Sequence, residues 1–186
     1  MIKVNHQFLE KYFFVPDWKI KHLFLGTFNP KGGNPVSYFY GRPGNFTWPV
    51  LSKIFKQDFL VNEIDFFDLL KEKNIACMDM IRHVIISPEH HLSVIGNGYK
   101  DSNIINKRVE RKYNTRFIKE VIQKNPGIKI YSTWGKGCKL KSWQKEIINI
   151  ANVIPLVSPS RAARVPKGLR KFDYIFENWD TRVVCD

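Results

Sequence analysis

Two short segments of the chain combine groups that can hold a phosphate with rings that can stack on a flat ligand. The first runs from Gly26 to Leu51 and contains GTFNP and YFYGRPGNFTWPVL, and the second, from Ser158 to Arg164, reads SPSRAAR. Glycine and proline leave backbone groups accessible to anions, while aromatic side chains stack on bases. The pattern predicts a site for a nucleic acid or a nucleobase.

The overall charge favours the same class of partner. The sequence has 30 Lys and Arg against 17 Asp and Glu, a formal net charge of +13 at pH 7. Such an excess attracts polyanions, with nucleic acid first and an anionic membrane surface second, although solvated lysine-rich faces give the same composition. No stretch is long enough to cross a bilayer, and residues 1–11 do not have the pattern of a signal peptide. We expect a cytoplasmic monomer that does not enter a membrane.

Histidine and cysteine give no metal-binding pattern. Cys77, Cys138 and Cys185 lie far apart, and His90 and His91 have no acidic or cysteine partner at ligand spacing. The odd, scattered cysteines also give no disulfide framework, which fits a reducing compartment. We expect neither a metal nor another cofactor.

The elements that would position these groups alternate along the chain. Short apolar runs predict strands at residues 20–25, 75–81, 128–133 and 153–157. Helical periodicity predicts helices at residues 45–55, 63–72, 114–124, 137–150 and 167–179, and residues 27–44 and 82–112 predict loops, the second with a short helix after Asp101. We expect one three-layer α/β/α domain over residues 1–186, with a central, mostly parallel four-stranded sheet.

The predicted sheet also indicates where the functional site should lie. In open α/β sheets the ligand crevice lies outside the carboxyl ends of the strands. The segments that follow predicted strands begin at Gly26, at Asp79, at Thr133 and at Ser158. These segments are therefore the candidate walls of the site.

The order of the motifs resembles the uracil-DNA glycosylase superfamily. After a strand that ends in glycine, the first motif of the mismatch-specific uracil and hypoxanthine-DNA glycosylases is matched by Tyr40, Gly41, Pro43, Asn45 and Trp48. IACMDMI followed by Asp101-Ser102 is similar to the hypoxanthine-acting branch, and LVSPSRAAR falls at the second motif of the superfamily. The resemblance covers the chain from the first predicted strand to the end of SPSRAAR.

The resemblance implies a DNA glycosylase of base-excision repair, which flips a deaminated base, hypoxanthine or uracil, out of DNA and hydrolyses its N-glycosidic bond. It implies a base pocket in which Tyr40 is the stacking ring, formed by Gly26, Thr27, Phe28, Tyr40 and Ser158. It also implies DNA contacts from Lys136, Ser160, Arg161 and Arg164.

The catalytic position departs from the superfamily pattern. Many members have their water-positioning residue two places after the first-motif glycine, where this chain has Phe28, which cannot activate water. Either Asn29 takes the role through a bulge, or Asn45 does, as the hypoxanthine-acting branch implies. We favour Asn45, the alternative being that it only caps the following helix. Asp79 is a second candidate, as a carboxylate near the sugar, although a strand-end aspartate also caps turns.

A binding function is the alternative to catalysis. Ser158 stands where the superfamily offers His or Asn to the departing base, and it is a weaker donor. Together with Phe28, it leaves open a module of the same fold that binds nucleic acid or a nucleobase without cleaving it.

Overall fold

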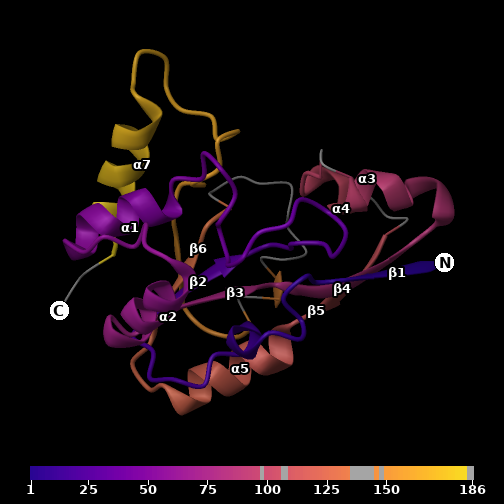
Figure 1. Cartoon of the computed structure of the whole chain (residues 1–186), viewed down its shortest axis with the longest axis horizontal. Helices are drawn as coiled ribbons and strands as arrows, with labels where there is room; N and C mark the ends of the chain where they lie inside the picture. Colours follow the sequence, from indigo (N-terminus) through magenta and orange to yellow (C-terminus); the bar gives the residue numbers. More distant parts are fainter. Residues whose placement is uncertain (97–98, 106–108, 135–144, 147–148, 184–186) are drawn as a thin grey trace.

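The central sheet has four parallel strands. The computed structural model describes residues 1–96, 99–105, 109–134, 145–146 and 149–183 (Figure 1). The strand order is β3-β2-β6-β7, with β2 (His22–Gly26), β3 (Ile75–Asp79), β6 (Lys129–Ser132) and β7 (Val153–Pro155). In the register of β2 and β3, Gly26 lies opposite Asp79. The predicted parallel sheet is confirmed, and its strand ends meet at one edge.

The two faces of the sheet are covered by different elements. Phe24 of β2 packs into an aromatic core with α1 (Thr47–Phe55), α2 (Glu63–Glu72) and α7 (Lys171–Asp180). Its neighbours Leu23 and Leu25 point the other way, into a core shared with α5 (Thr115–Lys124). This alternation along a strand produces the predicted three layers, which Figure 1 shows with α5 on the opposite side of the sheet from α1 and α7.

Helix α2 shows how local sequence sets an element. The side chain of Asn62 accepts hydrogen bonds from the backbone N–H groups of Ile64 and Asp65, and the first turn carries Glu63 and Asp65. A capping oxygen and acidic residues at the N-terminus both stabilise a helix start. The observed bounds coincide with the predicted ones.

A second sheet was not predicted. Its antiparallel strands β1 (Ile2–Asn5), β4 (Ile81–Ile86) and β5 (Glu110–Tyr113) lie in the order β1-β4-β5. The predicted strand at 75–81 was wrong at its end, because β3 stops at Asp79 and only Met80 separates it from β4. The loop predicted at 82–112 was also wrong, since its strands pair with partners distant in sequence, which local periodicity cannot reveal.

The remaining helices differ from the predicted ones in number and in bounds. Besides β4 and β5, the segment contains α3 (His91–Ile95) and α4 (Ser102–Ile105), and α4 is the short helix predicted after Asp101. Helix α7 begins at Lys171 instead of residue 167, because Gly168 has a positive φ of 88° that a helix does not accommodate. Most of the helix predicted at 137–150 lies outside the described residues. No helix among the described residues is long and apolar enough to cross a membrane.

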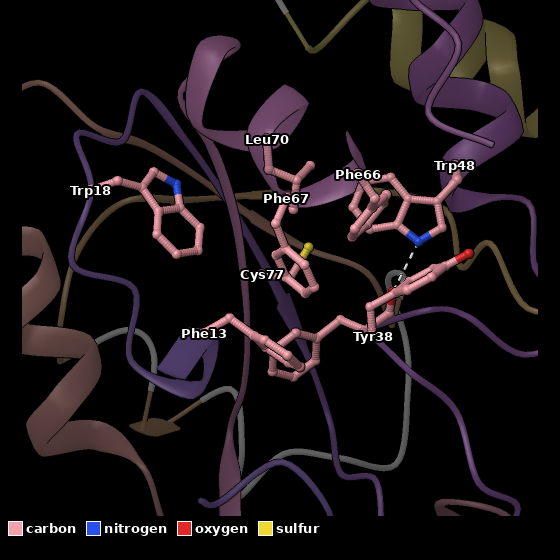
Figure 2. A pocket seen from close by; sticks show the side chains of 9 residues that line it. Phe13, Trp18, Tyr38, Trp48, Phe66, Phe67, Leu70 and Cys77 are labelled. Atoms are coloured by element: carbon pink, nitrogen blue, oxygen red, sulfur yellow. Dashed lines mark hydrogen bonds between the residues drawn. The ribbon is translucent and has the colours of Figure 1, made fainter. Parts of the chain in front are cut away.

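Two of the three rings in the predicted aromatic loop belong to the core. Tyr38 stacks on Phe66 with 4.1 Å between ring centroids, and the Nε1–H of Trp48 donates to the carbonyl of Phe39 over 2.9 Å (Figure 2). The gap among these rings measures about 10 Å³. That volume holds one water molecule at most, so this aromatic pocket is not a base-binding site.

Candidate functional site

A cleft of about 890 Å³ opens at the carboxyl ends of the strands of the central sheet. Its volume lies within the range of ligand pockets, roughly 300–1,000 Å³. Most of the residues predicted from the sequence line it, namely Gly26, Thr27, Phe28, Asn29, Tyr40, Asn45, Asp79, Ser158, Ser160 and Arg161. Arg164 is exposed and is not part of this lining, and Lys136 lies outside the described residues.

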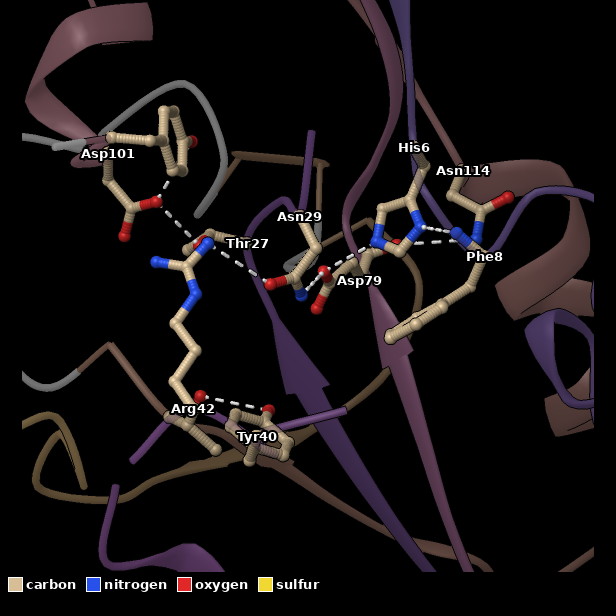
Figure 3. Close-up of polar contacts among 11 residues, drawn as sticks. His6, Phe8, Thr27, Asn29, Tyr40, Arg42, Asp79, Asp101 and Asn114 are labelled. Carbon is tan, nitrogen blue, oxygen red and sulfur yellow. Dashed lines mark hydrogen bonds and ion pairs between the residues drawn. The ribbon is translucent and has the colours of Figure 1, made fainter. Parts of the chain in front are cut away.

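Asp79 is the buried carboxylate of the cleft, with 2% of its surface exposed. Its Oδ2 lies 2.8 Å from Nε2 of His6, whose side chain is fully buried (Figure 3). Nδ1 of the same imidazole accepts the backbone N–H of Phe8 over 3.0 Å. Because Nδ1 is an acceptor, the proton sits on Nε2 and His6 donates to Asp79. Asp79 is therefore an acceptor held by a neutral histidine.

Asn29 connects Asp79 to a cation. Its Nδ2–H donates to Oδ2 of Asp79 over 2.8 Å, and its Oδ1 accepts from the guanidinium of Arg42 over 3.4 Å. These two contacts fix which way the amide points. The amide thus lies between a carboxylate and a guanidinium, with its nitrogen toward the negative group (Figure 3).

Gly26 allows two side chains to approach the backbone of β2. A Cβ atom at this position would lie 2.2 Å from Oδ1 of Asp79 and 3.0 Å from the hydroxyl of Tyr40. The Tyr40 hydroxyl is also 3.1 Å from Oγ1 of Thr133, and burial raises the pKa of Tyr40 well above its usual value. A glycine is required here because only a hydrogen fits between these groups.

A second carboxyl group stands on the other side of the cleft. Oδ1 of Asp101 accepts from Oγ1 of Thr27 over 2.8 Å and from the hydroxyl of Tyr99 over 3.2 Å. Burial raises the pKa of Asp101, and the two hydrogen bonds act in the opposite direction. Asp101 is therefore less acidic than a solvated aspartate.

Phe28 packs into the wall of the site. It is 2% exposed and meets the rings of His6 and Tyr99 edge-on, with centroid distances of 5.8 and 6.1 Å. The ring belongs to the core that also contains Leu25 and Met78. Its side chain packs against the two residues that hold the carboxyl groups, His6 and Tyr99.

The remaining predicted residues lie at the rim. Oδ1 of Asn45 accepts the N–H of Thr47 over 2.9 Å in the turn that leads into α1, and Asn45 also lines the cleft, whereas the N-cap residue of α1 is Phe46. The hydroxyls of Ser158 and Ser160 accept backbone N–H groups two residues later, which shapes the turn that carries Arg161. The N–H of Phe46 donates to the carbonyl of Pro159 and joins the two rim segments.

Sequence reasoning missed several residues of the site. His6, Arg42 and Tyr99 carried no predicted role, Thr133 was predicted only as the start of a wall segment, and Asp101 entered only through the Asp-Ser resemblance. His6 is placed beside the cleft by the small sheet, so no local sequence pattern indicates its position. Arg42 stands between Tyr40 and Asn45, and its place inside the first motif was the available signal.

A second cleft lies away from the predicted site residues. A cleft of about 590 Å³ lies at the opposite edge of the central sheet, where Lys19 and Lys124 line it, but none of the predicted site residues is there. Within the described ranges, no group of three or more His, Cys, Asp or Glu side chains is placed to hold a metal ion. The larger cleft is therefore the candidate functional site.

Comparison with known proteins gives a structural likeness. The chain is similar to the solution NMR structure of a Methanosarcina acetivorans protein that has been proposed to be a uracil DNA glycosylase. The likeness covers 90% of this chain and 91% of that one, with a TM-score of 0.57 and 17% sequence identity. No protein-family model and no curated protein matches the chain. At this identity, the likeness establishes the fold.

Proposed function

We propose that the chain is a monofunctional DNA glycosylase of base-excision repair that hydrolyses the N-glycosidic bond of a flipped hypoxanthine or uracil. The observation that carries the proposal is the convergence of Asp79, Asn29, Asn45 and Tyr40 on one cleft at the carboxyl edge of the central sheet. The fold of the Methanosarcina protein and the net charge of +13 support it. The charge and the cysteine pattern further suggest a cytoplasmic monomer acting on DNA.

The reaction needs negative charge near the sugar and a positioned water. As the glycosidic bond breaks, the sugar acquires oxocarbenium character and the base departs as an anion. Asp79 supplies the negative charge, because His6 and Asn29 both bind its Oδ2 while Oδ1 has no hydrogen-bond partner among the described residues. Fixed donors of this kind avoid reorganisation during the reaction.

Asn45 is the proposed water-positioning residue. Its Oδ1 holds one backbone N–H, and its Nδ2 has no partner among the described residues, so the amide retains capacity to bind water. Asn29 is the alternative, but its amide already joins Asp79 to Arg42. We therefore propose that Asn29 positions Asp79, that Asn45 places the water, and that Tyr40 lies against the flipped base. Arg161, on the rim, contacts the DNA backbone together with Ser160, Arg164 and Lys136.

Base release tests the proposal directly. Purified protein is incubated with duplex and single-stranded oligonucleotides that carry hypoxanthine or uracil, and abasic sites are then cleaved with alkali. We expect cleavage by the wild type, about 100-fold slower cleavage by Asn45→Ala, and no change for Asp17→Asn, an exposed residue outside the cleft. Failure of the wild type to exceed Asn45→Ala on both lesions would overturn the proposal.

A non-catalytic binding module is the second candidate. It is favoured by the burial of Phe28 and by the hydroxyl of Ser158, whose oxygen is already engaged by the N–H of Ser160. The same oligonucleotides separate the two functions. Salt-dependent binding without base release would support the module, whereas release by the wild type supports the enzyme.

A further inference from the structure

Arg42 is a cation in the cleft with few partners. Its guanidinium makes one contact with a hydrogen-bond acceptor among the described residues, the 3.4 Å contact to Asn29, and its Nε–H is buried without a partner. The guanidinium carbon lies 5.7 Å from the centroid of the Tyr99 ring. A guanidinium presents several donors in a fixed plane, and buried donors are normally satisfied. This one therefore has donors available for an acceptor on a ligand.

Asp101 complements Arg42 in the same part of the cleft. Both hydrogen bonds to its carboxyl group end on Oδ1, from Thr27 and from Tyr99, so Oδ2 has no partner among the described residues. Burial raises the pKa of Asp101 and the charge of Arg42 opposes that rise, but no ion pair joins the two among the described contacts. Figure 3 shows the guanidinium between Asp101 and Asn29. A donor group and an acceptor oxygen thus face one cleft without satisfying each other.

We infer that Arg42 and Asp101 read the lactam edge of the extruded base, with Arg42 donating to the carbonyl oxygen and Oδ2 of Asp101 accepting the adjacent ring N–H. The inference rests on the proposed glycosylase function and names its specificity determinants. Hypoxanthine and uracil both present a carbonyl next to a ring N–H. Adenine and cytosine present an amino group next to an unprotonated ring nitrogen, the opposite order of donor and acceptor.

This complementarity rejects adenine and cytosine, the bases from which hypoxanthine and uracil arise by deamination. With adenine or cytosine in place, the Asp101 carboxylate would face a ring nitrogen lone pair, and the Arg42 donors would face an amino group. Buried polar groups left unpaired in this way cost more than an absent hydrogen bond between exposed groups. Arg42 also lies where positive charge stabilises a departing base anion, a task for which Ser158 is a weak donor.

Substrates altered at single atoms test each contact. Single-turnover release is measured for uracil, for 3-methyluracil, which lacks the ring N–H, and for 4-thiouracil, whose sulfur is a weaker acceptor. The variants are Asp101→Asn, which keeps the shape of the side chain, and Arg42→Met. Lys124→Gln, which removes a positive charge at the opposite edge of the sheet, is the matched control. Thermal unfolding shows whether each variant is folded.

The change in the substrate rate ratio from wild type to variant decides the outcome, because this comparison cancels the intrinsic reactivity of each base. We expect the wild type to release uracil about tenfold or more faster than 3-methyluracil, and Asp101→Asn to abolish most of that preference. Arg42→Met should slow uracil release about tenfold or more, and it should lose the wild-type difference in rate between uracil and 4-thiouracil. Lys124→Gln should keep both wild-type ratios.

The failures are distinguishable. A wild type that releases bases with ratios unchanged in folded Asp101→Asn and Arg42→Met proteins overturns this inference and leaves the glycosylase proposal standing. A wild type that releases no base from any oligonucleotide overturns the proposed function, and the specificity inference with it.

Discussion

His6 and Asp79 are joined side chain to side chain across the corner where the two sheets meet, with Nε2 of His6 2.8 Å from Oδ2 of Asp79. His6 directly follows β1 of the small sheet, and Asp79 ends β3 of the central one. The backbone N–H of Phe8 fixes the tautomer that makes this bond possible. The carboxylate of the site therefore depends on a residue near the N-terminus, 73 positions earlier in the sequence.

Asp79→Asn should remove most of the activity while leaving DNA binding in place. The amide keeps the shape of the side chain but loses the negative charge that stabilises the sugar cation, so single-turnover base release should fall about 100-fold or more. Fluorescence anisotropy with a lesion oligonucleotide should give an unchanged or slightly tighter Kd. A variant with wild-type release would show that Asp79 is only structural.

His6→Ala should destabilise the fold and slow base release together. Removing the imidazole leaves a buried carboxylate with one donor fewer, which costs about 2–4 kcal/mol. Urea unfolding measures this destabilisation, and His91→Ala, which has no contact with Asp79, is the control. His6→Gln, which can still donate to the carboxylate, should recover part of the rate. Recovery of stability without any recovery of rate would contradict a positioning role.

Gly26→Ala should disrupt the site through direct contact. The added methyl group would lie 2.2 Å from Oδ1 of Asp79, so the carboxylate must move, and we expect about 2–4 kcal/mol of destabilisation with loss of activity. Gly127→Ala is the comparison, since nothing lies within 4 Å of its Cβ position and only its φ of 83° opposes the change. It should cost about 1–2 kcal/mol and leave the rate unchanged.

Asp101→Asn should stabilise the protein at neutral pH. Burial raises the pKa of this carboxyl in the folded state above the unfolded value of about 3.9, so ionisation of Asp101 opposes folding. This destabilisation of the folded state begins as the pH rises past the pKa of the unfolded state and reaches its full size above the pKa of the folded state. Urea unfolding across this range should give Asp101→Asn a higher free energy of unfolding than wild type, and this difference should disappear below about pH 4. A gain independent of pH would point to another cause.

Arg161→Gln should change how salt affects DNA binding. Arg161 is exposed at the rim of the cleft, and removing one contact to a phosphate reduces the slope of log K against log salt concentration by about 0.9 for duplex DNA. Binding of an undamaged duplex is measured between low and moderate salt. An unchanged slope would place Arg161 away from the phosphates.

The part of the site built on parallel strands could be predicted from the sequence. Alternating apolar segments imply a parallel sheet, and such a sheet gathers its strand ends at one edge, so Gly26, Asp79 and Ser158 were expected together. His6 could not be placed in the same way. Its position depends on pairing between β1 and β4, which are separated by most of the first half of the chain.

The second carboxyl group of the cleft shows the same limit. Asp101 lies in a segment whose strands and helices take their form from distant partners, so its side chain could not be directed toward Thr27 beforehand. Phe28 was identified as unable to activate water. Its packing between His6 and Tyr99 depends on contacts between residues distant in sequence, which no local pattern indicates.

The single residue between β3 and β4 has a consequence for inactivation. Met80 is the one residue between β3 of the central sheet and β4 of the small sheet, and His6 directly follows β1 of the small sheet. Sub-global opening of the small sheet would carry the histidine away from Asp79 while β2, β6 and β7 stay paired. On heating, catalytic activity should then be lost at a lower temperature than that at which the central sheet unfolds. The loss of activity would report the separation of the small sheet from the central sheet.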